Sequence, residues 1–189
     1  MTPATTGFRV KSGWAVAVLV AGTRTAPRVI ERAVVQLADP AVPESMQPYH
    51  AALERHRMAA ANAVRRLTAL VERFAAHSLS ELFGHYADHG YGLRGAAIVV
   101  GSVIDPQTIA NDHIRAHALE GQLFRGVIER AVEERRYAAR VFVEKELVRR
   151  GGETLRVSEP ELRRGSRSSD ARSADRGAPS TKWRRWPPG

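Results

Sequence analysis

The chain has 189 residues, of which 43% are hydrophobic, and it contains no cysteine. This length suits one domain with a surplus, and the absence of thiols excludes disulfides and cysteine-ligated metal sites. The formal net charge is +9, and residues 156–189 alone hold nine Lys/Arg against four Asp/Glu. More than half of the excess positive charge is therefore concentrated in this C-terminal segment.

The longest apolar run, residues 14–22, has nine residues, whereas a membrane span needs about 20. Basic residues precede this run, as in a secretory signal, but Arg24 interrupts the small-residue pattern that a cleavage site would need. We therefore expect a soluble cytoplasmic protein that makes no use of a membrane.

The N-terminal half predicts two strands and a long helical region. Residues 1–7 are polar and are expected to be loose. Residues 8–20 predict a central strand buried on both faces, because both alternating sets of positions are apolar after Ser12. A loop of hairpin length leads to a second strand near residues 28–37, antiparallel to the first. Ser45 is a plausible start for a helix to about His77, followed by a short second helix capped at Ser78 or Ser80 and closed by glycines.

The C-terminal half predicts strand, helix and strand. Residues 96–101 form a short buried strand, and Asp105-Pro106 has the form of a helix start. A helix to about Arg136 and a last strand over residues 139–147 follow. Beyond Gly151 the chain has too little apolar surface to offset the entropy of ordering. We expect one α/β domain over 8–150, in which a hairpin and then parallel strands form a single mixed sheet with helices packed on it, and a disordered tail over 151–189.

This order of elements resembles the ribonuclease H-like superfold with one hairpin strand missing. Residues 13–16, Gly-Trp-Ala-Val, are similar to the first strand of the Holliday-junction resolvase branch of that superfold. The resemblance implies a catalytic aspartate just before the glycine, but residues 9–12 read Arg-Val-Lys-Ser. It therefore implies ribonuclease H-like topology without two-metal nuclease chemistry.

Three polar side chains share one face of the predicted C-terminal helix. His113, His117 and Glu120 follow the spacing i, i+4 and i+7, which brings them together at 100° per residue. The same face carries the apolar residues expected to pack on the sheet, namely Ile114, Ala118, Gly121, Phe124, Ile128, Ala131 and Val132. Burying each polar group without a partner would cost about 1–3 kcal/mol. These groups should therefore be hydrogen-bonded, bind a metal or open into a cleft.

Two interpretations of this cluster stay open. In the structural one, an imidazole bonds the turn at Ser102 or Asp105, and Glu120 pairs with an arginine. In the functional one, a ligand site is formed, with His117 and Glu120 as the candidate catalytic groups; its residues are Ser102, Asp105, His113, Arg115, His117 and Glu120. Two imidazoles one helical turn apart suit zinc, so His113 and His117 are the candidate metal ligands, although the sequence demands no cofactor. A second His-x-x-x-His, at His85 and His89, is interpreted as a polar surface turn.

The tail interleaves basic and aromatic residues, namely Lys182, Trp183, Arg184, Arg185 and Trp186. This pattern is typical of single-stranded nucleic-acid binding, although nonspecific adhesion gives the same composition. The sequence favours a non-catalytic ribonuclease H-like domain that binds nucleic acid through this tail. The alternatives are a small-molecule or metal-dependent enzyme that uses His113, His117 and Glu120, and an interaction module that meets a partner or its own copy.

Overall fold

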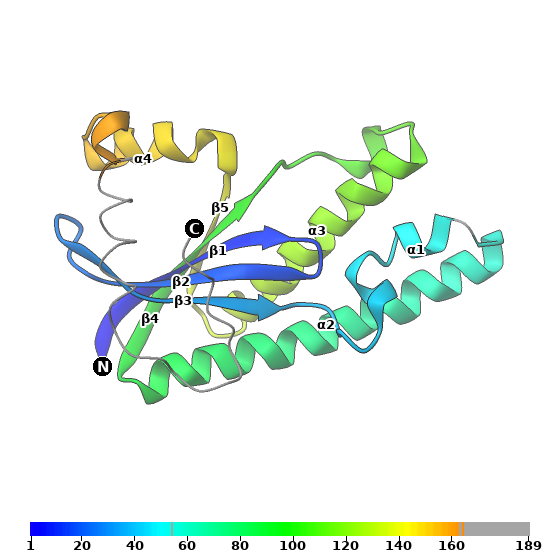
Figure 1. Ribbon diagram of the computed structural model, residues 1–189, viewed down its shortest axis with the longest axis horizontal. Helices are drawn as coiled ribbons and strands as arrows, with labels where there is room; N and C mark the ends of the chain where they lie inside the picture. Colours follow the sequence, from blue (N-terminus) through cyan, green and yellow to red (C-terminus); the bar gives the residue numbers. More distant parts are fainter. Residues whose placement is uncertain (54, 163, 165–189) are drawn as a thin grey trace.

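The computed structural model describes residues 1–53, 55–162 and 164. These residues form one mixed five-stranded sheet in the order β3-β2-β1-β4-β5, with helices packed against it (Figure 1). The strands are β1 (Thr2–Lys11), β2 (Trp14–Gly22), β3 (Pro27–Gln36), β4 (Tyr91–Val100) and β5 (Ala138–Val143). The helices are α1 (His50–Leu53), α2 (Arg57–Asp88), α3 (Asp112–Glu133) and α4 (Leu147–Leu155), with short 3-10 turns η1 (Pro43–Met46), η2 (Pro106–Thr108) and η3 (Glu144–Glu146). The predicted α/β class with a single mixed sheet is confirmed.

The N-terminal strand begins earlier and turns sooner than predicted. Residues 2–7, expected to be loose, belong to β1, which pairs in parallel with β4 and antiparallel with β2. The strand predicted over 8–20 is two strands, because Ser12 and Gly13 form a tight turn in which Gly13 has a φ of +80°. Glycine adopts this left-handed conformation without the steric cost of a side chain. The turn supplies the hairpin strand that the sequence interpretation had left out.

The helical region is divided differently from the prediction. The segment after β3 forms only η1 and α1, since Pro43 and Pro48 limit it to short turns. In α2 a single helix then runs without a break through Ser78, which is buried in its middle instead of capping a second helix. Side-chain periodicity therefore located the middle of the helix, but serine was a poor signal for its boundaries, since α2 begins at Arg57 and not near Ser45.

The C-terminal end of the domain also differs from the prediction. Strand β5 ends at Val143, and the charged residues expected at its exposed edge form η3. Residues 151–155, assigned to the tail, belong to α4. The long helix begins at α3, where Asn111 is the N-cap, whereas Asp105 caps only η2. The ordered domain thus continues past residue 150.

One face of the sheet is covered by α2 and α3. The core between them contains large, almost fully buried side chains from both layers: Phe8, Leu19, Val35, Ile98, Leu79, Leu82, Phe124 and Ile128. On the opposite face of β2, Val16, Val18 and Val20 are only half-buried, so the prediction that this strand is buried on both faces is wrong. Within the described ranges, no helix is long and apolar enough to span a bilayer.

The parallel strands β1 and β4 point toward the same end of the molecule (Figure 1). At that end α3 begins well beyond the last residue of β4, and its first turns lie beside α1 instead of the sheet (Figure 1). The carboxyl ends of parallel strands are where open α/β sheets usually hold ligands. The polar residues singled out in the sequence lie in these first turns of α3.

Candidate metal centre

The start of α3 is fixed by its own polar side chains. The Asn111 Oδ1 atom accepts a hydrogen bond of 3.0 Å from the backbone N–H of Ile114, which caps the helix. The Arg115 guanidinium donates to the carbonyl oxygens of Ile109 at 2.9 Å and Ala110 at 3.1 Å, and it pairs with Asp112 at 2.9 Å. These bonds tie the incoming loop to the first helical turns, so the histidines of α3 project from a rigid base.

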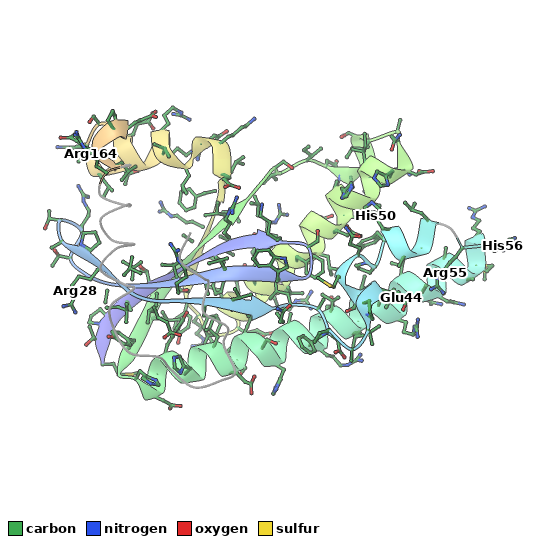
Figure 2. The ribbon with its side chains drawn as sticks, in the orientation of Figure 1. Arg28, Glu44, His50, Arg55, His56 and Arg164 are labelled. Atoms are coloured by element: carbon green, nitrogen blue, oxygen red, sulfur yellow. The ribbon has the colours of Figure 1, made fainter. Side chains whose placement is uncertain are left out.

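A third histidine reaches the same place from α1. The His50 backbone N–H donates to Glu120 Oε1 at 3.2 Å, and the ring Nδ1 lies 2.8 Å from the same oxygen. Figure 2 shows the His50 side chain at the end of α1 that faces α3. Both bonds come from one residue and end on one carboxylate oxygen, so Glu120 fixes the position and the ring orientation of His50 together.

The rings of His50, His113 and His117 form a compact cluster. The His50 ring centroid lies 4.6 Å from that of His113 and 4.1 Å from that of His117, and the two α3 rings are 4.8 Å apart. One ring nitrogen from each residue lies within 4.8 Å of the other two. Two of these histidines lie on adjacent turns of one helix and the third lies on a different element, so three imidazoles from two elements could hold one ion.

Glu120 is buried, with a side-chain exposure of 0%, and His50 is half-buried, with a side-chain exposure of 14%. A carboxylate only accepts hydrogen bonds, so the His50 Nδ1 beside it carries a proton and Nε2 presents a lone pair in the neutral ring. Neither His50 Nε2 nor Glu120 Oε2 has a hydrogen-bond partner, and both atoms are buried. A buried polar atom without a partner is costly. The unpaired Nε2 belongs to a ring that packs directly against two further imidazoles.

This arrangement fits a divalent transition metal. Three imidazoles with a carboxylate behind one of them match the ligand set and supporting hydrogen bond of zinc centres. Zn–N bonds of about 2.0–2.1 Å in a tetrahedron place ligand nitrogens roughly 3.3 Å apart, so spacings of up to 4.8 Å need only small side-chain rotations. His113 and His117 are exposed to solvent, which leaves a fourth coordination position on the solvent side.

The structure brings together only some of the residues that the sequence singled out. His113, His117 and Glu120 meet in one site, but His117 is exposed and does not pack on the sheet as expected. Ile114, placed in the apolar arc by its spacing, is 54% exposed. Glu120 is paired with His50 and not with an arginine. The first turns of α3 have left the sheet, so the face expected to be core meets α1 instead.

The remaining predicted site residues lie outside the cluster. The Arg115 guanidinium is occupied by the helix start, and Asp105 Oδ1 accepts from the backbone N–H of Gln107 at 2.9 Å. Ser102 is exposed in the loop after β4, and among the described residues neither it nor Asp105 forms a hydrogen bond with an imidazole. The tail residues 182–186 lie outside the described residues. Sequence reasoning missed His50 entirely, since it stands alone in a proline-rich segment with no periodic pattern.

In the second histidine pair, His89 is exposed at the turn that ends α2, as the sequence suggested, whereas His85 is half-buried. His85 Nε2 lies 2.9 Å from Glu31 Oε2, and these two side chains are only 17% and 20% exposed. His89 Nδ1 is 2.8 Å from the carbonyl oxygen of His85. The contact between His85 and Glu31 ties the end of α2 to the edge strand β3. It has a clear structural role, because both ring contacts are already made within the protein.

Tyr49 lies next to the cluster and between two carboxylates. Burial raises the pKa of its phenol, and the negative charges of Glu120 and Glu72 raise this pKa further. A groove of about 160 Å³ lies beside it between α2 and α3, and its lining includes Arg130 and Glu72, which contact each other at 3.4 Å. The phenol therefore stays protonated as a hydrogen-bond donor over the whole physiological range.

Comparison with known proteins assigns neither a family nor a function to this site. No protein-family model matches the chain, and no curated protein is detectably similar to it.

Proposed function

We propose that this protein is a metal-dependent enzyme whose centre binds a divalent transition ion, with zinc as the best-fitting metal, through His50, His113 and His117. One observation carries the proposal: a buried carboxylate holds His50 by Nδ1 and leaves a buried Nε2 without a partner beside two other imidazoles. In zinc proteins a carboxylate in this position fixes the tautomer and raises the basicity of the ligand.

The open side of the cluster favours catalysis over a structural role. Structural zinc sites are closed by four protein ligands, whereas catalytic sites keep three and leave a position for water. Three histidines meet here, and two of them are exposed. A bound metal would lower the pKa of its water to about 7 and so supply hydroxide near neutral pH. The reaction class that fits is metal-assisted hydrolysis.

The test uses the full chain purified without a histidine tag and freed of metal with a chelator. Calorimetric titration with Zn²⁺ should give one site per chain, and this site should be lost in both His50→Ala and His113→Ala. The matched control is His77→Ala on α2, whose side chain is 71% exposed and lies outside the cluster. Zn²⁺-dependent hydrolysis of an activated aryl ester should follow the same pattern. Equal zinc binding by His50→Ala and the parent chain would overturn the proposal.

A second proposal concerns the fold superfamily and is based on the order of the strands. The order β3-β2-β1-β4-β5, in which β2 alone runs opposite to the others, supports a ribonuclease H-like topology. The parallel strands β1, β4 and β5 contain no Asp or Glu, although two-metal nucleases need carboxylates to hold their ions. We therefore expect no Mg²⁺-dependent cleavage of DNA or RNA. Cleavage by protein that has been stripped of metal, purified again and supplied with Mg²⁺ alone would contradict this expectation.

A further inference from the structure

Strand β5 is the last strand of the sheet and pairs with β4 alone. None of its six residues is buried, whereas each of the other four described strands has buried residues. Val141 and Val143 nevertheless lie opposite the core residues Ile98 and Val100 of β4, so they point to the face that α2 and α3 cover. The core is therefore incompletely covered at this edge of a single chain.

A hollow of about 310 Å³ lies beside Val141 and Val143. It is bounded by β5, by α3, by the start of α4 and by the loop after β4. The other residues that line it are Val103 and two ion pairs, Arg125 with Glu129 at 3.4 Å and Arg150 with Glu146 at 2.8 Å. Because positive and negative charges balance and three valines line it, the hollow favours an apolar side chain over a charged one.

The outer edge of β5 is open to a further strand. Among the described residues no strand pairs with it on this side, and α4 packs mainly on η3 and extends away from β5 (Figure 1). An added strand would lie about 4.8 Å from β5 and would send alternate side chains to the face of the hollow. The opposite edge strand, β3, is less suited to pairing, because it begins with Pro27 and a bulge interrupts it near Ile30.

The sequence of β5 is complementary to its own sequence in the opposite direction. In an antiparallel pair related by a twofold axis, residues at equal distances on either side of the axis lie opposite one another. With Phe142 on the axis, it faces the same residue of a second copy, Val141 faces Val143, and Arg140 faces Glu144. Aromatic, aliphatic and oppositely charged cross-strand pairs of this kind all stabilise an antiparallel sheet.

The charged residues of this register are accessible to a partner. Arg140 is exposed and forms no ion pair with another described residue. Glu144 contacts Arg9 at 2.7 Å through one carboxylate oxygen, but its side chain is 43% exposed, so this carboxylate can also accept from a second guanidinium. The small residues Ala138 and Ala139 begin β5, at the position where the η3 turn of the second copy would lie.

We propose that β5 pairs with β5 of a second copy of this chain, antiparallel and centred on Phe142, so that one sheet continues through both chains. The pairing covers Val141 and Val143 of each chain with those of the other and uses the free backbone groups of both edges. A peptide of unrelated sequence would meet the same hollow but would not supply the matching order of charge and size. The inference is independent of the metal centre, since none of its residues belongs to the histidine cluster.

The chain contains no cysteine, so a single introduced thiol reports which residues meet their own copies. Phe142→Cys in the full chain, oxidised mildly in chelator, should form a disulfide-linked dimer, because opposite Cβ atoms lie about 4.5–5.5 Å apart. Arg140→Cys is the control for register, since the two thiols would be separated by about 13 Å along the strands. Val34→Cys is the control for the other edge, because it is also half-buried and lies on β3.

Sedimentation in chelator measures association without oxidation, and circular dichroism verifies that each variant is folded. Arg140→Glu and Glu144→Arg each place like charges opposite one another and should raise the dimer Kd by about fivefold or more. The double variant Arg140→Glu/Glu144→Arg restores opposite charges and should recover most of the lost affinity.

Three results would each overturn the proposal. The first is cross-linking of Phe142→Cys that is no greater than that of Arg140→Cys or Val34→Cys. The second is a double variant that associates no better than the two single variants. The third is a parent chain that stays monomeric up to its solubility limit, which would leave the β5 edge to a different partner.

Discussion

Glu120→Gln separates the metal-supporting role of this carboxylate from its role in packing. The amide has the same shape and keeps an oxygen that can accept from the His50 backbone N–H and from Nδ1, now at 3.2 and 2.8 Å. What is lost is the negative charge. Hydrogen bonds to charged groups contribute about 1.5–3 kcal/mol, against about 0.5–1.5 for neutral pairs. The imidazole is therefore held less firmly and donates less strongly to a metal.

The expected effect is a tenfold to hundredfold weaker Kd for Zn²⁺, which corresponds to about 1.4–2.7 kcal/mol. At a Zn²⁺ concentration 100 times the parent Kd, the metal stabilises the parent fold by about 2.7 kcal/mol and the variant by only about 0.4–1.4 kcal/mol. Without metal the two should differ much less, because the neutral amide avoids burying a charge in a position with 0% exposure.

Zinc titration by competition with a coloured chelator gives the two Kd values, and thermal unfolding with and without Zn²⁺ gives the difference in stabilisation. Glu72→Gln is the matched control, because this residue is 43% exposed on α2 and contacts Arg130, not a histidine. A Glu120→Gln protein that binds zinc within twofold of the parent would refute the argument that the carboxylate orients a metal ligand.

Three further outcomes follow from the structure. His117→Ala should abolish zinc binding yet change the metal-free Tm by no more than a few degrees, because exposed positions contribute about 0.5 kcal/mol or less; a variant that unfolds in chelator would instead show a packing role. Gly13→Ala should destabilise the fold by about 1–2 kcal/mol in urea, since its φ is +80° and the new Cβ would lie 3.2 Å from Met46; unchanged stability would mean that the turn relaxes freely. Burial and the charge of Glu31 raise the pKa of Tyr86 well above its ordinary value, so the unfolded chain ionises first and stability should fall as pH rises above about 10; Tyr86→Phe should lose part of this fall, and an identical alkaline profile would contradict the assignment.

Local patterns in the sequence predicted the strands and helices better than they predicted the turns. Strand alternation and helical spacing located the sheet and α2, because both report which side chains are buried. The hairpin at Gly13 was overlooked because the residues on both sides of it are apolar, so the apolar run looked continuous. The start of β1 was missed for the opposite reason: Thr2, Thr5 and Thr6 look polar, yet Thr6 is buried in a strand that pairs on both sides. Pairing with distant strands decides such positions, and no local pattern reports it.

The candidate site shows the same division between local and distant information. Spacing alone placed His113, His117 and Glu120 together, because residues three and four apart share a helix face. His50 lies 70 residues before Glu120, so only the folded chain could show that it completes the cluster. The sequence correctly indicated that Glu120 needs a hydrogen-bond partner. The partner, His50, comes from a segment whose sequence gives no indication of this role.

A single stripe on α3 explains why core-like spacing and ionisable residues coincide. His113, His117, Glu120 and Phe124 follow one another along the same face of the helix. At Phe124, which is 1% exposed, the stripe packs on the sheet; one turn earlier the helix has passed the end of β4, and Glu120 meets His50 of α1 instead. The apolar part of the stripe is fixed by the sheet and the polar part is held rigidly beyond it. A helix that overhangs its sheet thus holds a polar cluster on a rigid base while His113 and His117 stay exposed to solvent, and this rigidity is what the proposed metal centre requires.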